Sequence, residues 1–171
     1  MNLNKAVFLD RDGVLNQELG DYVCRLEDFH ILEHNFKALK ELQDRGFLLI
    51  VITNQGGLAK GWYNEETLGK MHRQLLSTYN QQGVEITDVY YCRHNPLYNG
   101  NCLCRKPGSI MLEKAIARFN VDKTRSYFIG DRERLGSESD IRRLIDAINE
   151  LMIKEADKYN VAAALQKKSV E

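Results

Sequence analysis

The sequence feature that most constrains the fold is a short apolar run that ends in two acids. Residues 6–9 are all apolar, and Asp10, Arg11 and Asp12 follow them directly. An unbroken apolar run that ends in charges is typical of a buried strand in a parallel sheet. In open α/β sheets, ligands bind at the C-terminal ends of such strands. The run therefore predicts an α/β fold with a polar site after its first strand.

We expect the two acids to share one site. Gly13 lets the backbone turn sharply, so that Asp12 can fold back over Asp10. Two carboxylates that are held close repel one another, and they need a shared proton or cation. The pair therefore indicates a metal site, a nucleophile with an acid–base partner, or both. The alternative is an ordinary polar turn after a strand.

Length and composition favour one globular domain over residues 1–171. Hydrophobic residues make up 43% of the chain and charged residues 28%, as in ordinary globular proteins. Lys+Arg and Asp+Glu both number 24, so no net basic charge favours nucleic acid as a partner. No apolar stretch reaches the ~20 residues that span a bilayer. The first residues lack the apolar core of a signal peptide, and we expect a cytoplasmic protein without a membrane partner.

Helices and strands are predicted to alternate along the chain. Phe36, Leu39 and Leu42 recur at helical spacing and predict a helix over 35–45, which Gly46 ends. The same reasoning predicts further strands at 47–52, 84–92 and 127–129, and further helices at 64–82 and 109–119. This order predicts a doubly wound, Rossmann-like and mainly parallel sheet with helices on both faces.

Polar groups also follow the later strands. Thr53, Asn54 and Gln55 precede two glycines, a combination that suits a phosphate oxyanion, although a glycine-rich turn is the simpler interpretation. Arg105 and Lys106 precede a predicted helix, where they can clamp an anionic substrate. A third acid, Asp131, stands at the end of the last strand.

The segment 17–33 is polar and without a clear period, and we expect a loop over the end of the first strand. Asn16, Glu18, Asp21 and Tyr22 could contact a polar ligand there, or they could be ordinary solvated loop residues.

Four soft metal ligands lie in one loop, 92–104. Cys92, His94, Cys102 and Cys104 form a Cys-x-His…Cys-x-Cys set, which matches a closed tetrahedral zinc site. The loop has few apolar residues, and metal binding can supply its order, at ~10–16 kcal/mol in small zinc-finger peptides. All four positions are filled by protein, so this zinc is expected to be structural. The alternative is a reactive or redox thiol cluster.

The motifs together resemble a known superfamily. Phe8–Asn16, Thr53–Gln55, Cys104–Pro107 and Ile129–Asp131 look like the four signature motifs of the haloacid dehalogenase superfamily of phosphatases. With the cysteine and histidine loop, the resemblance narrows to a zinc-loop subfamily. That subfamily includes phosphatases of heptose bisphosphate and of histidinol phosphate.

The resemblance implies a mechanism and a set of roles. Asp10 is the nucleophile that forms an aspartyl-phosphate, and Asp12 is the general acid and base. Thr53 and Lys106 hold the phosphoryl oxygens. Mg²⁺ binds Asp10, the backbone oxygen of Asp12, and Asp131.

The resemblance also implies a substrate, most closely D-glycero-D-manno-heptose 1,7-bisphosphate losing its 7-phosphate. The candidate substrate contacts are Glu18, Asp21, Tyr22, Asn54, Gln55, Arg105 and Arg132. Without a large cap domain, the site is expected to be open. The alternative substrate is histidinol phosphate, which is the phosphate ester of an amino alcohol. The alternative function is that of a catalytically impaired, zinc-stabilised binding or scaffold protein.

The tail departs from the superfamily pattern. Leu135 stands where relatives usually carry a second acid, which puts the support of the magnesium site in doubt. Residues 136–171 are expected to form an atypical helical tail, with an apolar stripe over 139–159. The stripe can pack on the sheet or serve for self-association.

Overall fold

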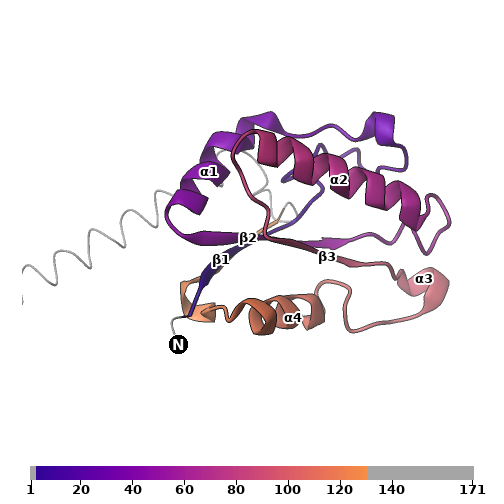
Figure 1. The fold of residues 1–171 in the computed structure, drawn as a ribbon. Coiled ribbons are helices and arrows are strands. Elements are labelled where there is room, and N and C mark those ends of the chain that lie inside the picture. Colours follow the sequence, from indigo (N-terminus) through magenta and orange to yellow (C-terminus); the bar gives the residue numbers. More distant parts are fainter. Residues whose placement is uncertain (1–2, 131–171) are drawn as a thin grey trace, which may run out of the picture.

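The computed structural model describes residues 3–130, which form a three-layered α/β fold around one sheet (Figure 1). The sheet has the strand order β3-β2-β1-β4, and all of its pairings are parallel. Its strands are β1 (Lys5–Leu9), β2 (Phe47–Asn54), β3 (Asp88–Cys92) and β4 (Tyr127–Ile129). The predicted parallel sheet is confirmed, and β1 lies inside it between β2 and β4.

Helices cover both faces of the sheet, as expected. Helices α1 (Phe36–Asp44) and α2 (Glu65–Gln81) lie on one face, and α4 (Ile110–Phe119) lies on the other (Figure 1). A short helix, α3 (Pro96–Asn99), lies in the loop after β3. Single 3₁₀ turns are η1 (Leu26–Asp28), η2 (Glu33–Asn35) and η3 (Lys123–Arg125). The described residues contain no inserted cap domain, in agreement with the sequence.

The core consists of two apolar layers, one on each face of the sheet. Along β1, Val7 and Leu9 join the layer under α1 and α2, while Ala6 and Phe8 join the layer against α4. Successive side chains of a strand point to opposite faces, so a strand buried on both faces is apolar throughout. This explains the unbroken apolar run at 6–9 and fixes where β1 ends.

The ends of the helices follow local sequence signals. The side chain of Asn64 caps α2 by accepting a hydrogen bond of 2.9 Å from the backbone N–H of Thr67. Gly46 follows α1 with a φ of +82°, in the left-handed region that glycine adopts at no steric cost. The predicted boundaries of these two helices hold to within a residue.

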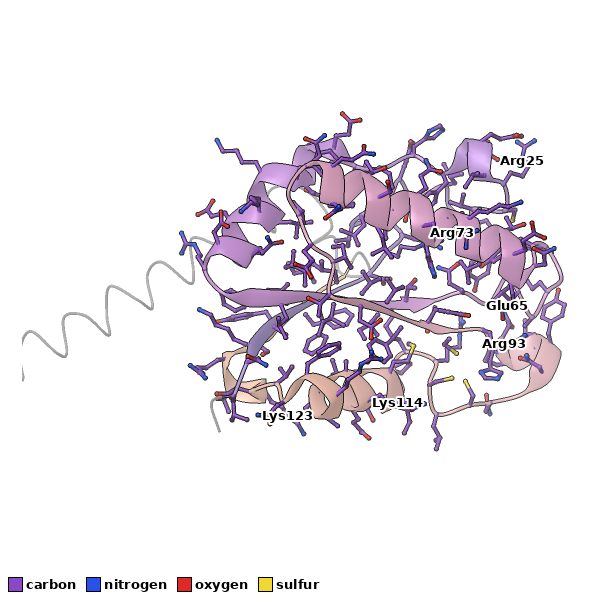
Figure 2. All side chains as sticks on the ribbon, in the orientation of Figure 1. Arg25, Glu65, Arg73, Arg93, Lys114 and Lys123 are labelled. Atoms are coloured by element: carbon purple, nitrogen blue, oxygen red, sulfur yellow. The ribbon has the colours of Figure 1, made fainter. Side chains whose placement is uncertain are left out.

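Strand β3 begins later than predicted and is only half-buried. Val84 and Ile86 are buried, but the paired residues begin at Asp88. The outer part of β3 contacts the first turn of α2, where the hydroxyl of Tyr91 donates to Glu65 at 2.9 Å. Glu65 also pairs with Arg93 at 3.2 Å, and Figure 2 shows these two residues side by side.

Several expectations fall on residues that the structure does not describe. Asp131, Arg132, Leu135 and the helical tail at 136–171 lie outside 3–130, and so does the proposed self-association through that tail. Among the described helices, none is long and apolar enough to cross a membrane.

Candidate active site

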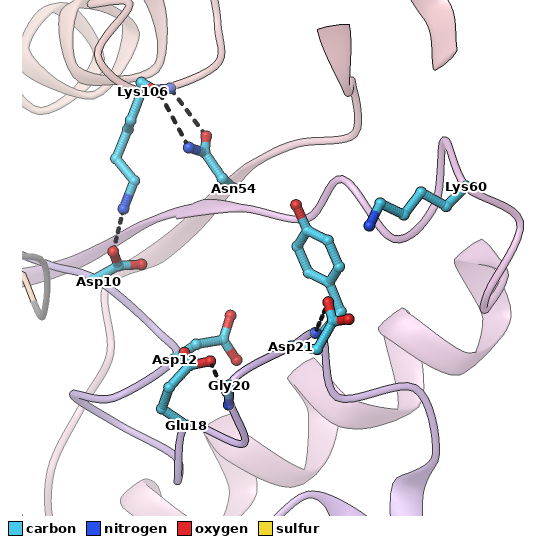
Figure 3. A pocket seen from close by; sticks show the side chains of 9 residues that line it. Asp10, Asp12, Glu18, Gly20, Asp21, Asn54, Lys60 and Lys106 are labelled. Atoms are coloured by element: carbon cyan, nitrogen blue, oxygen red, sulfur yellow. Dashed lines mark hydrogen bonds and ion pairs between the residues drawn. The ribbon is translucent and has the colours of Figure 1, made fainter. Parts of the chain in front are cut away.

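A polar pocket lies at the C-terminal ends of β1 and β2 (Figure 3). It has a volume of about 310 Å³ and brings together residues far apart in the sequence. Its lining residues are Asp10, Asp12, Glu18, Gly20, Asp21, Tyr22, Asn54, Lys60 and Lys106. Most of the residues predicted for the site therefore meet in one place.

Asp10 lies in the pocket immediately after β1. Its carboxylate forms an ion pair with Lys106, and its Oδ1 accepts a hydrogen bond of 2.8 Å from the backbone N–H of Arg11. Burial raises the pKa of Asp10, and the neighbouring Lys106 only partly opposes this effect. A second cation beside Asp10 would therefore favour its ionised form.

Asp12 is held as a carboxylate by three residues. Arg11 donates to Oδ1 at 2.7 and 3.2 Å, and Asn16 donates to the same oxygen at 3.0 Å. Gln55 donates to Oδ2 at 2.8 Å. Burial acts to raise the pKa of Asp12, but the charge and hydrogen bonds of Arg11, with those of Asn16 and Gln55, lower it below its usual value. Gly13, at φ +79°, makes the turn that the sequence predicted.

A buried amide links Asp12 to the end of β2. Gln55 is fully buried, and its Nε2 donates to Thr53 Oγ1 at 3.0 Å as well as to Asp12. The hydroxyl of Tyr63 donates to Gln55 Oε1 at 2.6 Å. Since these bonds occupy both ends of the amide, the side chain of Gln55 positions Asp12. Its contact with a substrate stays a prediction.

Asn54 holds Lys106 in place through the backbone. Its Oδ1 accepts from the backbone N–H of Lys106 at 2.9 Å, and its Nδ2 donates to the carbonyl of Lys106 at 3.2 Å (Figure 3). The ammonium of Lys106 also donates to the carbonyl of Ile52 at 3.0 Å. Lys106 is thus fixed beside Asp10, whereas the hydroxyl of Thr53 is buried next to Gln55.

The remaining predicted contacts lie around the pocket mouth. Glu18 accepts from the backbone N–H of Gly20 at 3.1 Å, and Asp21 accepts from that of Tyr22 at 2.8 Å. Arg105 donates to the carbonyl of His94 at 3.0 Å and to the hydroxyl of Tyr22 at 3.4 Å. Arg105 therefore connects the loop at 92–104 to the pocket wall.

The four predicted zinc ligands converge in the loop after β3. One ligand atom from each residue lies within 4.8 Å of the other three. The four residues are Cys92, His94, Cys102 and Cys104. Cys104 Sγ lies 3.2 Å from both Cys92 Sγ and His94 Nδ1. Around a tetrahedral zinc ion with Zn–S bonds of about 2.3 Å, two sulfur ligands lie about 3.8 Å apart. The atoms of this cluster are therefore close enough to share one ion. The backbone N–H of Arg105 also points at Cys102 Sγ, at 3.4 Å, as is common around thiolate ligands.

Sequence reasoning missed three residues that shape the pocket. Arg11 is fully buried, Tyr63 is buried, and Lys60 lines the pocket. A charged residue between two acids was a usable signal for Arg11. For Tyr63 and Lys60, nothing in the local pattern indicated a role, because their importance depends on contacts made in the folded chain.

A parallel sheet with an acid pair after its first strand, and a lysine held beside the first acid, defines a phosphatase of the haloacid dehalogenase type. A family model described as polynucleotide kinase 3 phosphatase matches residues 6–158. The chain belongs to this phosphatase family and is a phosphoric monoester hydrolase.

Individual relatives agree on the type of enzyme. A D-glycero-beta-D-manno-heptose-1,7-bisphosphate 7-phosphatase of Haemophilus ducreyi is 43% identical over 133 residues, covering 75% of this chain and 72% of that protein. A Helicobacter pylori protein of the same name is 37% identical, with coverages of 78% and 76%. The crystal structure of a D,D-heptose 1,7-bisphosphate phosphatase from B. bronchiseptica, complexed with magnesium and phosphate, matches at a TM-score of 0.68. It is 31% identical and covers 74% of this chain and 70% of its own.

Proposed function

We propose that this protein removes the 7-phosphate from D-glycero-D-manno-heptose 1,7-bisphosphate. The observation that carries the proposal is the pocket in which Asp10, Asp12 and Lys106 meet, in a chain whose relatives at 35–43% identity are heptose bisphosphate phosphatases. The relatives support this substrate over histidinol phosphate. The intact acid pair and the fixed Lys106 argue against an impaired scaffold. A role in making heptose precursors of surface polysaccharide follows from the same substrate.

The chemistry proceeds in two displacements at phosphorus. An oxygen of Asp10 attacks the phosphorus atom, the bond from phosphorus to the sugar oxygen breaks, and Asp12 gives its proton to the leaving alkoxide. Water then attacks the aspartyl-phosphate while Asp12 takes its proton, and phosphate leaves Asp10. Lys106, which contacts Asp10 in the structure, neutralises charge on the phosphoryl oxygens.

Asp12 has to change protonation state during this cycle. Its hydrogen bonds from Arg11, Asn16 and Gln55 favour the carboxylate, which is the form required in the second displacement. A bound phosphate dianion is a nearby like charge, and it raises the pKa of Asp12. Substrate binding therefore supports the proton that the first displacement requires.

The donors in the pocket fit a magnesium ion. Burial raises the pKa of Asp10, and Lys106 only partly opposes this, so a further cation would stabilise the carboxylate. Oxygen atoms are the ligands that Mg²⁺ prefers. Asp10, the backbone oxygen of Asp12, and Asp131 would hold the ion. Bound there, Mg²⁺ supplies a Lewis acid that stabilises charge on the phosphoryl group.

The cysteine and histidine cluster fits a structural zinc ion. Three thiols and one imidazole fill a tetrahedral shell, so no position remains for a substrate. The four cysteines of residues 3–130 are free thiols, which a reducing compartment maintains. The free thiols support a cytoplasmic enzyme. The names of the relatives and the zero formal net charge support a small phosphorylated sugar, rather than nucleic acid, as its partner.

Phosphate release tests the proposal. The wild-type protein with Mg²⁺ should release phosphate from heptose 1,7-bisphosphate, supplied as both anomers, faster than from histidinol phosphate. Asp10→Asn should reduce the rate by about 10³-fold or more, because the amide is a poor nucleophile. Asp44→Asn, at an exposed acid on α1, is the matched control. Equal rates on the two substrates would refute the assignment of the sugar. No release by folded, zinc-loaded protein would refute the enzymatic function.

A further inference from the structure

The pocket has a second cation on the side away from Lys106. The ammonium of Lys60 lies 3.8 Å from the centroid of the Trp62 ring and 5.4 Å from that of the Tyr22 ring. Figure 3 shows Lys60 on the opposite side of the pocket from Asp10 and Lys106. Cation–π contacts of this kind hold a lysine without neutralising its charge.

The charges around the pocket leave Lys60 available for a ligand. Lys106 pairs with Asp10, and Arg11 pairs with Asp12. Within residues 3–130, the ammonium of Lys60 forms no ion pair and no hydrogen bond, and its contacts are those with the two rings. The carboxylates of Asp21 and Glu18, which share the lining, accept hydrogen bonds from nearby backbone N–H groups. An ammonium group that rests on two rings and forms no direct ion pair keeps its charge available for an anionic ligand.

The wall around Lys60 is tied to other parts of the fold. Tyr22 and Trp62 pack edge to face with ring centroids 6.0 Å apart, and Arg105 donates to the hydroxyl of Tyr22. A Cβ atom at Gly56 would lie 2.7 Å from the hydroxyl of Tyr22. The backbone of the turn that follows β2 therefore fits closely against this hydroxyl. These contacts hold the rings on which Lys60 rests.

We propose that Lys60, framed by Tyr22 and Trp62, binds a second anionic group of the substrate, the phosphate that is not cleaved. The inference rests on the proposed function, because it takes Lys106 and Asp10 as the reacting end of the pocket. It makes the enzyme selective for bisphosphates over monophosphates of the same sugar. It also disfavours substrates whose far end is a cation, such as phosphorylated amino alcohols.

Binding can be observed directly at this wall, because Trp62 is the only tryptophan of the chain. Asp10→Asn protein, in which turnover is blocked, is titrated with fructose 1,6-bisphosphate, fructose 6-phosphate and the two corresponding heptose phosphates. Within a sugar pair, the bisphosphate should change the fluorescence of Trp62 and bind at least tenfold more tightly than the monophosphate. Adding Lys60→Gln should abolish that difference, and adding Lys60→Arg should preserve most of it.

Kinetics give a second measurement with a matched control. Lys60→Gln should lower the ratio of kcat/KM for a bisphosphate to kcat/KM for its monophosphate by at least tenfold, mainly through KM. Lys70→Gln, at an exposed lysine of α2, should leave the ratio unchanged. Equal ratios in wild type and Lys60→Gln, or equal affinities without a Trp62 signal, would overturn the inference.

The two proposals can fail separately. If the wild type cleaves heptose 1,7-bisphosphate but Lys60→Gln keeps the wild-type ratio, the function stands and the Lys60 site is wrong. If heptose bisphosphate is not cleaved while the fructose pair still shows the Lys60-dependent difference, the site stands and the assigned sugar is wrong.

Discussion

Single side chains decide the state of the acid–base group. Asp12 accepts from three residues, and one of them, Gln55, is oriented by the hydroxyl of Tyr63. An amide can rotate to exchange its oxygen and nitrogen, and only its partners determine which end faces Asp12. Tyr63 is therefore a positioning residue, which acts on Asp12 through Gln55.

Tyr63→Phe tests this role. The change leaves Gln55 Oε1 buried without its donor, and we expect a loss of about 1–3 kcal/mol in the free energy of unfolding. The hydrogen bond from Gln55 to ionised Asp12 should weaken, which raises the pKa of Asp12. The limb of the kcat against pH profile that belongs to Asp12 should therefore move to higher pH. Tyr98→Phe, at an exposed ring, is the control, and an unmoved limb would contradict the role of Tyr63.

The site residues differ in how far sequence could predict them. Asp10 and Asp12 were predictable because a buried strand ending in acids is a strong local pattern, and Lys106 because its motif is specific. The use of Asn54 to hold the backbone of Lys106 was not predictable, since the two residues are 52 positions apart. Local patterns specify which residues are polar, and tertiary contacts specify what each one binds.

Among the elements, the loop after β3 has little apolar packing of its own. Leu97 and Leu103 are 90% and 77% exposed, so the loop buries little apolar surface of its own. Its only described helix, α3, has four residues and is capped by Asn95. Arg105 and Lys106 follow the loop directly, and its order therefore determines where these two cations point.

Removal of zinc should disorder this loop and the residues that follow it. After dialysis against a strong chelator, hydrogen exchange at 92–104 should accelerate and the midpoint of thermal unfolding should fall, because metal binding stabilises the folded form. Backbone amides of α1, far along the chain from the ligands, serve as the internal control. Unchanged exchange and an unchanged midpoint would show that the cluster does not hold a structural metal.

Elements with clear periods were predicted well, and β3 shows where such prediction stops. Val84 and Ile86 are apolar because they are buried under α2, yet the parallel ladder begins at Asp88. Hydrophobicity reports burial and does not report strand pairing. The short helix α3 was not predicted because it buries no residue and therefore has no apolar period. Its only local signal is the Asn-Pro pair at its start.

At the scale of the whole molecule, the stability should depend on pH through His72. This residue of α2 is largely buried, and its Nε2 has no hydrogen-bond partner among the described residues. Burial, with a smaller contribution from Arg11, lowers the pKa of His72 from 6.5 to about 4, while Asp12 acts in the opposite direction. Between about pH 4 and pH 6.5, the unfolded chain therefore binds more protons at His72 than the folded chain does.

The free energy of unfolding should fall as the pH drops from about 6.5 to about 4, by up to about 3 kcal/mol from His72 alone. Asp10, whose pKa is raised, contributes with the opposite sign, and a variant is needed to separate the two. Urea unfolding of His72→Leu across this range should show a smaller fall than the wild type. His30→Gln, on the surface, is the matched control. Identical slopes in wild type and His72→Leu would contradict the assignment.

The position of β1 between β2 and β4 has a consequence for synthesis of the chain. Strand β1 leaves the ribosome before both of its neighbours, and it gains the second one only when residues 127–129 have emerged. Until then one edge of an apolar strand has no partner, and such edges pair readily with strands of other molecules. Nascent chains that stop short of β4 should therefore be the forms most prone to aggregate and most dependent on chaperones.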